Sequence, residues 1–395
     1  MKRFLFVIQR YGLDVDGGAE LYCRWLAEHC MLQSQITILT TTARDYISWD
    51  NHFEPGQSTI NDIPVIRAPV LQSRNINEFN RFTEQILTGS PSEDSQHDWL
   101  RAQGPWSPGI LEYIRDHHSE YDGLIFFTYL YAPSVLGARI APRKSILIPT
   151  AHDEPVAHLS IFHRLYSEVA GLLFLTPAEQ TFVESTYSVA GKPSRLLGTG
   201  VDLPESPLRP EDVREKYGIN GDILLYIGRV ETGKGCGELI RYFNDYRSLH
   251  PGTLTLVLAG RRHMPVPDDP AIVCPGYIPD DDLKPLIEAS TVVMVPSPFE
   301  SLSILLLQAF ACRKPVIANG HSAVLAGHCR RSNGGLYYET RDEFIETLDL
   351  LLKRKELRVQ LGQNGQAYVG REYTWASVVG KFHEFVESTL PASRV

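Results

Sequence analysis

The feature that most constrains the fold of this chain is a regular alternation of short β-rich runs with runs of helical period. Such an alternation is typical of parallel sheets whose strands are joined by crossover helices. It breaks once, in the Gly- and Pro-rich stretch 198–212, because neither a strand nor a helix tolerates that composition. The runs that predict strands are 4–9, 36–41, 124–127, 145–150 and 172–175 before the break, and 223–227, 253–259, 271–274, 292–295 and 315–318 after it.

These two series of strands predict two doubly wound α/β domains of similar size. A chain of 395 residues is also too long for one ordinary core. We expect an N-terminal domain at 1–200, a C-terminal domain at 201–372, and an amphipathic helix at 373–395 that returns to the N-terminal domain. Residues 42–106 are polar and weakly periodic, and we expect an irregular connection of functional importance there. The clearest helical runs are 21–29, 177–186, 237–250, 281–289 and 304–311.

The composition argues against several classes of protein. A formal charge of −9 disfavours broad nucleic-acid binding, and no apolar run reaches the roughly 18 residues of a membrane helix. The first residues lack the long apolar run and the small-residue cleavage site of a signal peptide. The six cysteines form no C-x-x-C pair, which favours free thiols in a reducing cytoplasm. We therefore expect a soluble, cytoplasmic protein.

The strongest chemical signal lies at 292–320, where an apolar strand ends at Pro296 and a helix is predicted to begin near residues 301–303. In open α/β sheets ligands bind beyond the carboxyl ends of the strands, and the free N–H groups of a helix start favour a phosphate. Glu300 would project there as an acceptor for sugar hydroxyls, and Gln308 would reach a ribose. The alternative is a capped helix with a surface glutamate, and spacing alone does not separate the two.

Two further loops carry groups that suit a phosphate. Arg229 follows the predicted strand 223–227, and Lys234 lies in a Gly-flanked turn before the next helix. A planar fork of donors and a compact point charge both suit a diphosphate, although ordinary surface cations are the alternative. The stretch lacks the complete P-loop pattern. Near the N-terminus, Gly17 and Gly18 separate a predicted strand from a predicted helix.

Taken together, these stretches resemble the family 4 glycosyltransferases, which are retaining enzymes of the GT-B fold. The order and spacing of the motifs carry the resemblance, because each motif alone is loose. The matching motifs are GGAE, HD, GTGVD, GRVETGKG, VLAG, PGYIPDDDLKPLIEAS and PSPFESLSILLLQAFACRKPVIA. The resemblance is dense from 198 to 335 and thin from 42 to 106. It implies an α/β, GT-B architecture of two Rossmann-like domains that face a cleft.

The resemblance implies roles for residues of the C-terminal domain. Arg229 and Lys234 match the cationic pair that binds the diphosphate of the donor, and Glu300 matches the acid that holds the hydroxyls of the donor sugar. Gln308 departs from the family, which usually has a second glutamate on the ribose, and the lost charge predicts weaker ribose binding. The backbone amides that would face sugar and phosphate are those of Ser301, Leu302 and Ser303.

In the N-terminal domain, Gly17 and Gly18 match the glycine loop that approaches the diphosphate and the reacting sugar. His152 matches a histidine near the anomeric centre of that sugar, and a hydrogen-bonded loop histidine is the alternative. Two neighbouring carboxylates, Asp14 and Asp16, would accept hydroxyls of the sugar or only form the turn. Aromatic side chains of the 42–106 segment would stack on a sugar acceptor or pack in the core; they are Trp49, Phe53, Trp99 and Trp106.

The implied function is transfer of a hexose from a nucleoside-diphosphate sugar, UDP-glucose first, to a glycan or lipid-linked saccharide in cell-surface or exopolysaccharide synthesis. We expect no cofactor, because the nucleotide sugar is a co-substrate. We expect no metal either, because the donor half has no D-x-D-like acid pair at a strand end, so cations and a helix start must meet the charge of the departing diphosphate. The family also implies peripheral contact with the inner face of the membrane, although the sequence shows no strong basic amphipathic helix.

Two other functions stay open. The glutamine at 308 suggests a nucleotide-sugar-binding subunit that has lost its activity. A GT-B-like scaffold would also suit a nucleotide-sugar epimerase. Turnover of the donor and the identity of the product sugar separate both from a transferase.

Overall fold

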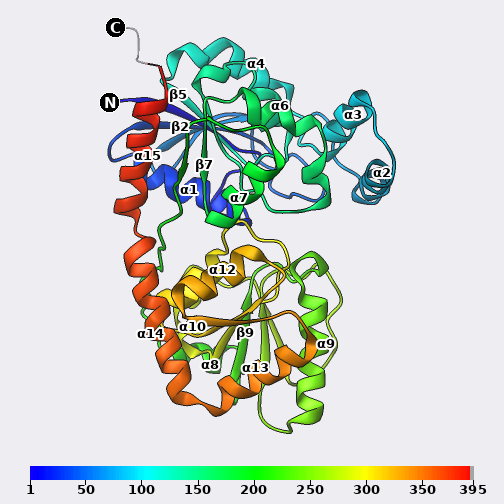
Figure 1. The fold of residues 1–395 in the computed structure, drawn as a ribbon, viewed down its shortest axis with the longest axis vertical. Coiled ribbons are helices and arrows are strands. Elements are labelled where there is room, and N and C mark those ends of the chain that lie inside the picture. The colour runs from blue at the N-terminus through cyan, green and yellow to red at the C-terminus, as the bar shows by residue number, and fades with distance from the viewer. Residues whose placement is uncertain (392–395) are drawn as a thin grey trace. The chain divides into compact units, whose positions relative to one another are not determined.

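The computed structural model describes residues 1–391, and the chain divides into two compact units. Unit 1 comprises Met1–Thr199 together with the segment that begins at Trp375, and unit 2 is Gly200–Thr374. Each unit is a sheet of mainly parallel strands with helices on both faces (Figure 1). The predicted class, two doubly wound α/β domains, is therefore confirmed.

Unit 1 is built on an eight-stranded sheet in the order β3-β4-β2-β1-β5-β6-β7-β8. Its neighbouring strands are parallel except β3 and β4, which form an antiparallel hairpin at one edge. The strands are β1 (Arg3–Val7), β2 (Gln35–Thr41), β3 (Gly56–Ile60), β4 (Ile63–Ala68), β5 (Gly123–Phe127), β6 (Ser145–Ile148), β7 (Gly171–Phe174) and β8 (Ser194–Leu196). The helices are α1 (Gly18–Cys30), α2 (Ile76–Thr88), α3 (Glu93–Gln103), α4 (Pro108–His117), α5 (Ala132–Gly137), α6 (Ile161–Glu168), α7 (Pro177–Thr186) and α15 (Trp375–Thr389).

Strand β1 shows why both faces of this sheet are covered. Successive side chains of a strand point to opposite faces. Leu5 and Val7 belong to an apolar core of the unit. Phe4 and Phe6 meet the ring of Phe382 in α15, at centroid distances of 5.6 and 6.0 Å. The C-terminal helix thus packs back onto unit 1, as the amphipathic tail predicted (Figure 1).

Unit 2 is built on a six-stranded parallel sheet in the order β11-β10-β9-β12-β13-β14. One apolar core lies between one face of this sheet and the apolar stripes of α9 and α13. The strands are β9 (Ile223–Ile227), β10 (Thr255–Ala259), β11 (Ile272–Gly276), β12 (Val292–Val295), β13 (Val316–Asn319) and β14 (Gly335–Tyr338). The helices are α8 (Pro210–Lys216), α9 (Cys236–Leu249), α10 (Asp280–Ala289), α11 (Ile304–Ala311), α12 (Ala323–Ser332), α13 (Arg341–Lys353) and α14 (Lys355–Glu372).

The expectation of an irregular connection at 42–106 is wrong, because regular elements occupy much of this segment. It contains the hairpin β3–β4 and the helices α2 and α3. Asn61 and Asp62 turn the hairpin with φ of 47° and 62°, the pair of positive values that a two-residue turn of type I′ requires. Asn75 and Ser92 cap α2 and α3 by accepting backbone N–H groups. These turn and cap residues are typical of a hairpin and of helix starts. The weak apolar periodicity of the segment favoured an irregular connection instead.

Two general features agree with the composition. All six cysteines are free, as their spacing predicted. Among residues 1–391, no helix combines the length and the apolar character that crossing a membrane requires.

Candidate functional site

In unit 1, the predicted site residues follow neighbouring parallel strands. The glycine loop follows β1 and His152 follows β6, and β5 lies between these two strands in the sheet. Parallel strands end at the same edge, so these loops emerge from one edge of the sheet. The Thr128 hydroxyl after β5 also lies 3.4 Å from the Gln9 side-chain oxygen after β1.

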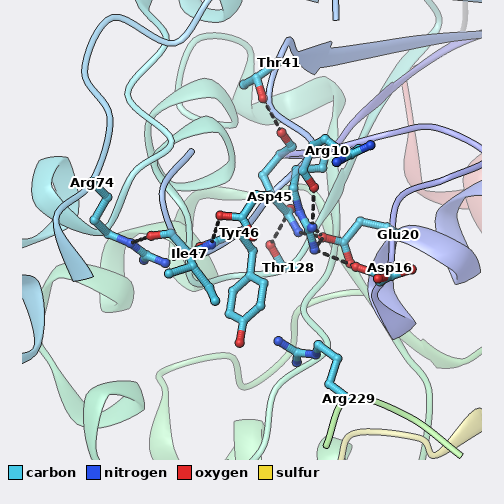
Figure 2. A network of polar contacts seen from close by, with 12 residues as sticks. Arg10, Asp16, Glu20, Thr41, Asp45, Tyr46, Ile47, Arg74, Thr128 and Arg229 are labelled. Carbon is cyan, nitrogen blue, oxygen red and sulfur yellow. Dashed lines mark hydrogen bonds and ion pairs between the residues drawn. The ribbon is translucent and has the colours of Figure 1, made fainter. Parts of the chain in front are cut away.

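A buried ion pair shapes the loop between β1 and α1. The Nη2 of Arg10 lies 2.5 Å from Oε1 of Glu20, and both side chains are buried. Arg10 also donates to the backbone carbonyl of Asp16 at 2.8 Å (Figure 2). It donates to the backbone carbonyl of Arg44 at 2.8 Å as well. Removing one partner of a buried pair typically costs about 3–5 kcal/mol. Arg10 and Glu20 therefore fix the glycine loop to α1 and to the segment after β2.

The two glycines of this loop differ in what surrounds them. Gly17 has a φ of 151°, and a Cβ there would lie 2.1 Å from Oε2 of Glu20. Gly18 is exposed, and a Cβ there would meet no atom within 4 Å. The helix α1 that starts here has no side-chain cap. The protein itself therefore requires Gly17, whereas the space beside Gly18 is open to a ligand.

His152 forms part of a small polar cluster. Its Nε2 lies 3.5 Å from Oε1 of Glu154, which also accepts a 2.7 Å hydrogen bond from the Tyr129 hydroxyl. Burial alone would raise the pKa of Glu154, but its contacts with His152 and Tyr129 hold that pKa below its usual value. Glu154 is thus ionised at neutral pH and orients the imidazole. The adjacent Asp153 pairs with His158 instead, at 2.8 Å.

Glu179, in the first turn of α7, is a supporting residue that the sequence analysis did not identify. Its Oε1 accepts the Ala151 N–H at 2.7 Å, and its Oε2 accepts the Leu175 N–H at 2.6 Å. Burial raises the pKa of Glu179 to about 8, although these backbone hydrogen bonds act in the opposite direction. Ala151 directly precedes His152, and Leu175 follows β7. One buried side chain therefore holds the ends of two neighbouring strands and the loop that carries His152.

In unit 2, the two predicted cations and the predicted acid follow β9 and β12, which are neighbours in the sheet. The Nζ of Lys234 lies 2.8 Å from Oε1 of Glu300. The Nη2 of Arg229 lies 3.4 Å from Oε1 of Glu231. All four side chains are partly exposed. Each cation thus already has a carboxylate partner, and an anion that binds here must exchange with it.

The loop 296–303, which carries Glu300, is held from two sides. Gly235, in the turn after Lys234, has a φ of 75°, and a Cβ there would lie 2.3 Å from the Pro296 carbonyl oxygen. The side-chain amide of Asn319, at the end of β13, donates to the same oxygen at 2.9 Å. These contacts fix where the loop leaves the sheet.

The same loop ends in a helix start that offers free backbone donors. Ser303 has a φ of 71° and is the N-cap of α11, but its side chain makes no cap hydrogen bond. The first turn of α11 holds no acidic residue that would offset its partial positive charge. Leu302, Ser303 and Gln308 are buried, and Ser301 is partly exposed. The start of α11 is therefore suited to an anion.

The aromatic side chains of the 42–106 segment are divided between core and surface. Trp49 and Trp99 are each 1% exposed and pack in the core, so they are not available to stack on an acceptor. Phe53 and Trp106 are partly exposed. Of the two loop carboxylates, Asp14 lies 3.4 Å from Arg44 in an exposed ion pair.

Several supporting residues escaped the sequence analysis. Glu20 stood inside the GGAE motif, but its partner Arg10 could not be inferred from spacing. Glu231 lies two residues from Arg229, a separation that carries no signal in a loop. The described residues include no group of three or more His, Cys, Asp and Glu side chains arranged to hold a metal ion.

Residues 210–368, which lie in unit 2, match the family described as glycosyl transferases group 1. A D-inositol 3-phosphate glycosyltransferase of Corynebacterium jeikeium is 21% identical over 98% of this chain and 95% of its own length. A mannosylfructose-phosphate synthase of Agrobacterium fabrum is 20% identical over 59% of this chain. This chain spans about half the length of that relative (56%) and of an uncharacterised Methanocaldococcus jannaschii glycosyltransferase (45%).

Solved structures resemble the whole chain. Sucrose-phosphate synthase from Thermosynechococcus elongatus has a TM-score of 0.73 at 16% identity, over 98% of this chain and 99% of its own. HepE from Anabaena, in complex with UDP and glucose, has a TM-score of 0.72 at 17% identity, over 98% of this chain and 100% of its own. At this identity the likeness shows the fold, and it confirms the predicted GT-B architecture.

Proposed function

We propose that this chain is a retaining glycosyltransferase of the family 4 type, which transfers a hexose from UDP-glucose to a glycan or lipid-linked saccharide. The observation that carries the proposal is the pairing of Lys234 with Glu300 beside an uncapped helix start, inside a glycosyl transferases group 1 domain. A cation, an acid and free N–H groups complement the diphosphate and the hydroxyls of a nucleotide sugar. The names of two similar structures support the choice of donor, because they report HepE with UDP-glucose and with UDP and glucose.

In this proposal unit 2 binds the nucleotide sugar. Arg229 and Lys234 leave their carboxylate partners and bind the diphosphate. Glu300, released from Lys234, accepts hydrogen bonds from the sugar hydroxyls. Gln308 binds the ribose as a neutral amide, with roughly half the strength of a charge-assisted hydrogen bond. The backbone N–H groups that face sugar and phosphate are those of Ser301, Leu302 and Ser303.

The acceptor hydroxyl attacks the anomeric carbon on the face that the diphosphate leaves. The C–O bond to the diphosphate breaks, the C–O bond to the acceptor forms, and a phosphate oxygen of the leaving group takes the proton of the acceptor. Arg229, Lys234 and the start of α11 meet the charge that develops on the diphosphate, without a metal ion or other cofactor. In unit 1, the glycine loop with Gly17 and Gly18 approaches the diphosphate and the transferred sugar. His152 lies near the anomeric centre of that sugar.

The acceptor and the setting of the reaction follow from the family resemblance. Unit 1 binds the saccharide or lipid-linked acceptor, and the product enters a cell-surface or secreted polysaccharide. The reaction takes place in the cytoplasm at the inner face of the membrane. The six free cysteines suit a reducing compartment.

Hydrolysis of the donor tests the proposal. A thermal-shift screen of nucleoside diphosphates first identifies the nucleotide, because a ligand at about 100 times its Kd adds about 2.7 kcal/mol of stability. The wild-type chain should then release UDP slowly from UDP-glucose without an acceptor. Glu300→Ala should abolish that release and keep the unfolding midpoint of the wild type.

Two other outcomes would point elsewhere. Binding of UDP without any turnover in the wild type would favour an inactive nucleotide-sugar-binding subunit, which the glutamine at 308 suggests. A changed sugar that is still attached to UDP, detected by NMR, would favour an epimerase.

A further inference from the structure

A fully buried histidine lies behind the loop 296–303. His328, on α12, is 0% exposed. Its Nε2 lies 3.0 Å from the carbonyl oxygen of Leu302, and its Nδ1 lies 3.1 Å from the hydroxyl of Tyr368 on α14. Leu302 directly precedes Ser303, the residue with positive φ from which α11 starts. One imidazole therefore joins the end of this loop to α14.

The hydroxyl of Tyr368 is the centre of a larger buried network. It accepts a hydrogen bond of 3.2 Å from Nε of Arg331 and lies 3.1 Å from the hydroxyl of Tyr373. Tyr368 is 1% exposed and Tyr373 is 7% exposed. The network thus ties α12, α14 and the residue after α14 to the backbone of the loop 296–303.

The hydrogen-bonding capacities of these groups determine the direction of each bond. A carbonyl oxygen only accepts, so Nε2 of His328 carries the proton that Leu302 receives. The Nδ1 of a neutral imidazole then accepts, and Tyr368 must donate to it. The Tyr368 oxygen has two remaining acceptor sites, which Arg331 and Tyr373 fill. The Tyr368 hydroxyl thus donates one hydrogen bond and accepts two.

The surroundings of His328 keep it neutral. Burial, together with the positive charge of Arg331, lowers the pKa of His328 to about 3, although its hydrogen bond to the Leu302 carbonyl acts in the opposite direction. The titratable groups that face it are Arg331, Tyr368 and Tyr373. The Nε2–H tautomer therefore persists over the whole range of physiological pH.

We propose that His328 is a positioning residue for the nucleotide-sugar site: as the Nε2–H tautomer it holds the Leu302 carbonyl and so fixes the turn at Ser303 from which the first N–H groups of α11 are presented. This inference rests on the proposed function, because it takes the loop 296–303 as the part of unit 2 that meets the donor. A non-glycine residue in the left-handed region persists only where its surroundings hold it there. The bond from His328 to Leu302 is one such restraint, and it acts one residue before Ser303.

Two variants that each imitate one ring nitrogen separate the two hydrogen bonds of the imidazole. The amide nitrogen of glutamine reaches the position of Nε2, so His328→Gln keeps a donor to Leu302 and loses the acceptor for Tyr368. The amide of asparagine reaches only the position of Nδ1, so His328→Asn keeps an acceptor for Tyr368 and leaves the Leu302 carbonyl without a partner. Both variants remove the same ring and leave one bond of the network unmade, so similar losses of stability are expected.

The measurement is the Kd of UDP for the full-length chain, by calorimetry, together with the unfolding midpoint of each variant. We expect His328→Asn to raise the Kd about tenfold and His328→Gln to raise it less than about threefold, since an unsatisfied buried carbonyl disorders the loop. Equal Kd values for the two variants, or a Kd that follows the loss of stability alone, would show that His328 only packs.

The variant Arg229→Ala distinguishes a failure of this inference from a failure of the proposed function. If the wild type binds UDP and Arg229→Ala weakens binding while both His328 variants bind as the wild type does, the positioning role is wrong and the proposed site stands. If the wild type binds no nucleoside diphosphate, the proposed function is wrong and the inference is wrong with it.

The tautomer itself can be read without a ligand. In ¹⁵N-edited NMR spectra of the histidine side chains, the His328 ring should show a protonated Nε2 and a bare Nδ1 at neutral pH. Tyr368→Phe removes one hydroxyl and keeps the ring packing. It should leave Nδ1 without its donor, while Nε2 stays protonated because the Leu302 carbonyl still needs a donor. A protonated Nδ1 in the wild type would overturn the proposal.

Discussion

Lys234 and Glu300 form an ion pair of 2.8 Å, although one follows β9 and the other follows β12. The pair forms because these two strands are neighbours in the sheet, and parallel neighbours deliver their loops to one edge. In this structure the cation assigned to the diphosphate and the acid assigned to the sugar bind each other. In the proposed function, ligand binding at this site is therefore an exchange of partners.

We expect Arg229→Ala and Lys234→Ala each to weaken UDP binding by about 1.5–3 kcal/mol, which is roughly a 10- to 100-fold rise in Kd. Each change removes a charged donor from the diphosphate, and calorimetric titration with UDP measures the effect. Glu300→Gln is the matched control, because it releases Lys234 from its partner and should leave the affinity for UDP equal or higher. An unchanged Kd in both cation variants would refute the diphosphate site.

Alanine substitutions at the adjacent glycines Gly17 and Gly18 should separate an effect on stability from an effect on activity. Gly17→Ala places a Cβ 2.1 Å from Glu20 at a φ of 151°, so we expect a loss of about 1–3 kcal/mol in the free energy of unfolding. Gly18→Ala meets no atom of the protein and should stabilise the chain by about 0.4–1 kcal/mol, because alanine leaves the unfolded chain less conformational freedom than glycine does. Donor hydrolysis should nevertheless fall in Gly18→Ala, because the added methyl group occupies the space proposed for the ligand. Full activity in Gly18→Ala would remove this loop from the site.

Glu179→Gln should lower turnover and leave nucleotide binding intact. Both carboxyl oxygens of Glu179 accept backbone N–H groups, and an amide offers only one oxygen in their place. The loop that carries His152 then loses an anchor, whereas the residues proposed to bind UDP lie in unit 2. We expect slower UDP release from UDP-glucose, measured with saturating donor, and a Kd for UDP within about twofold of the wild type. A fall in UDP affinity that matches the fall in turnover would mean that Glu179 acts only through general stability.

His328 should make the chain less stable in mild acid. Its pKa is about 3 in the folded chain and near 6.5 in the unfolded chain, so between these values only the unfolded chain binds the proton. The stability that neutral His328 contributes is thus present above about pH 6.5 and is lost as the pH falls, by about 2 kcal/mol between pH 7 and pH 5. Denaturant unfolding of the wild type and His328→Gln at both pH values measures this. The difference in stability between the two chains should change by that amount, and a constant difference would contradict the assignment.

The strands and helices with strong local signals could be predicted closely. The predicted strands 223–227 and 292–295 coincide with β9 and β12, and the predicted helices 177–186 and 304–311 coincide with α7 and α11. Buried parallel strands are continuous apolar runs, and Gly and Pro mark their ends. The hairpin β3–β4 was missed because exposed residues dominate β3, and such a strand leaves no apolar pattern.

The sequence by itself determined the two doubly wound units, because apolar period and chain-breaking residues are local properties. It also determined which loops could carry the chemistry, since ordered motifs follow the ends of predicted strands. Only the tertiary structure decided the partners of these groups: Lys234 with Glu300, Glu179 with the backbone before His152, and His328 with the backbone before Ser303. Each of these contacts joins residues that are distant in the chain and depends on the order of strands in a sheet or on the docking of a helix. Residue spacing does not encode either of these, so the sequence predicted candidate ligand-binding residues without the side chains that hold them in place.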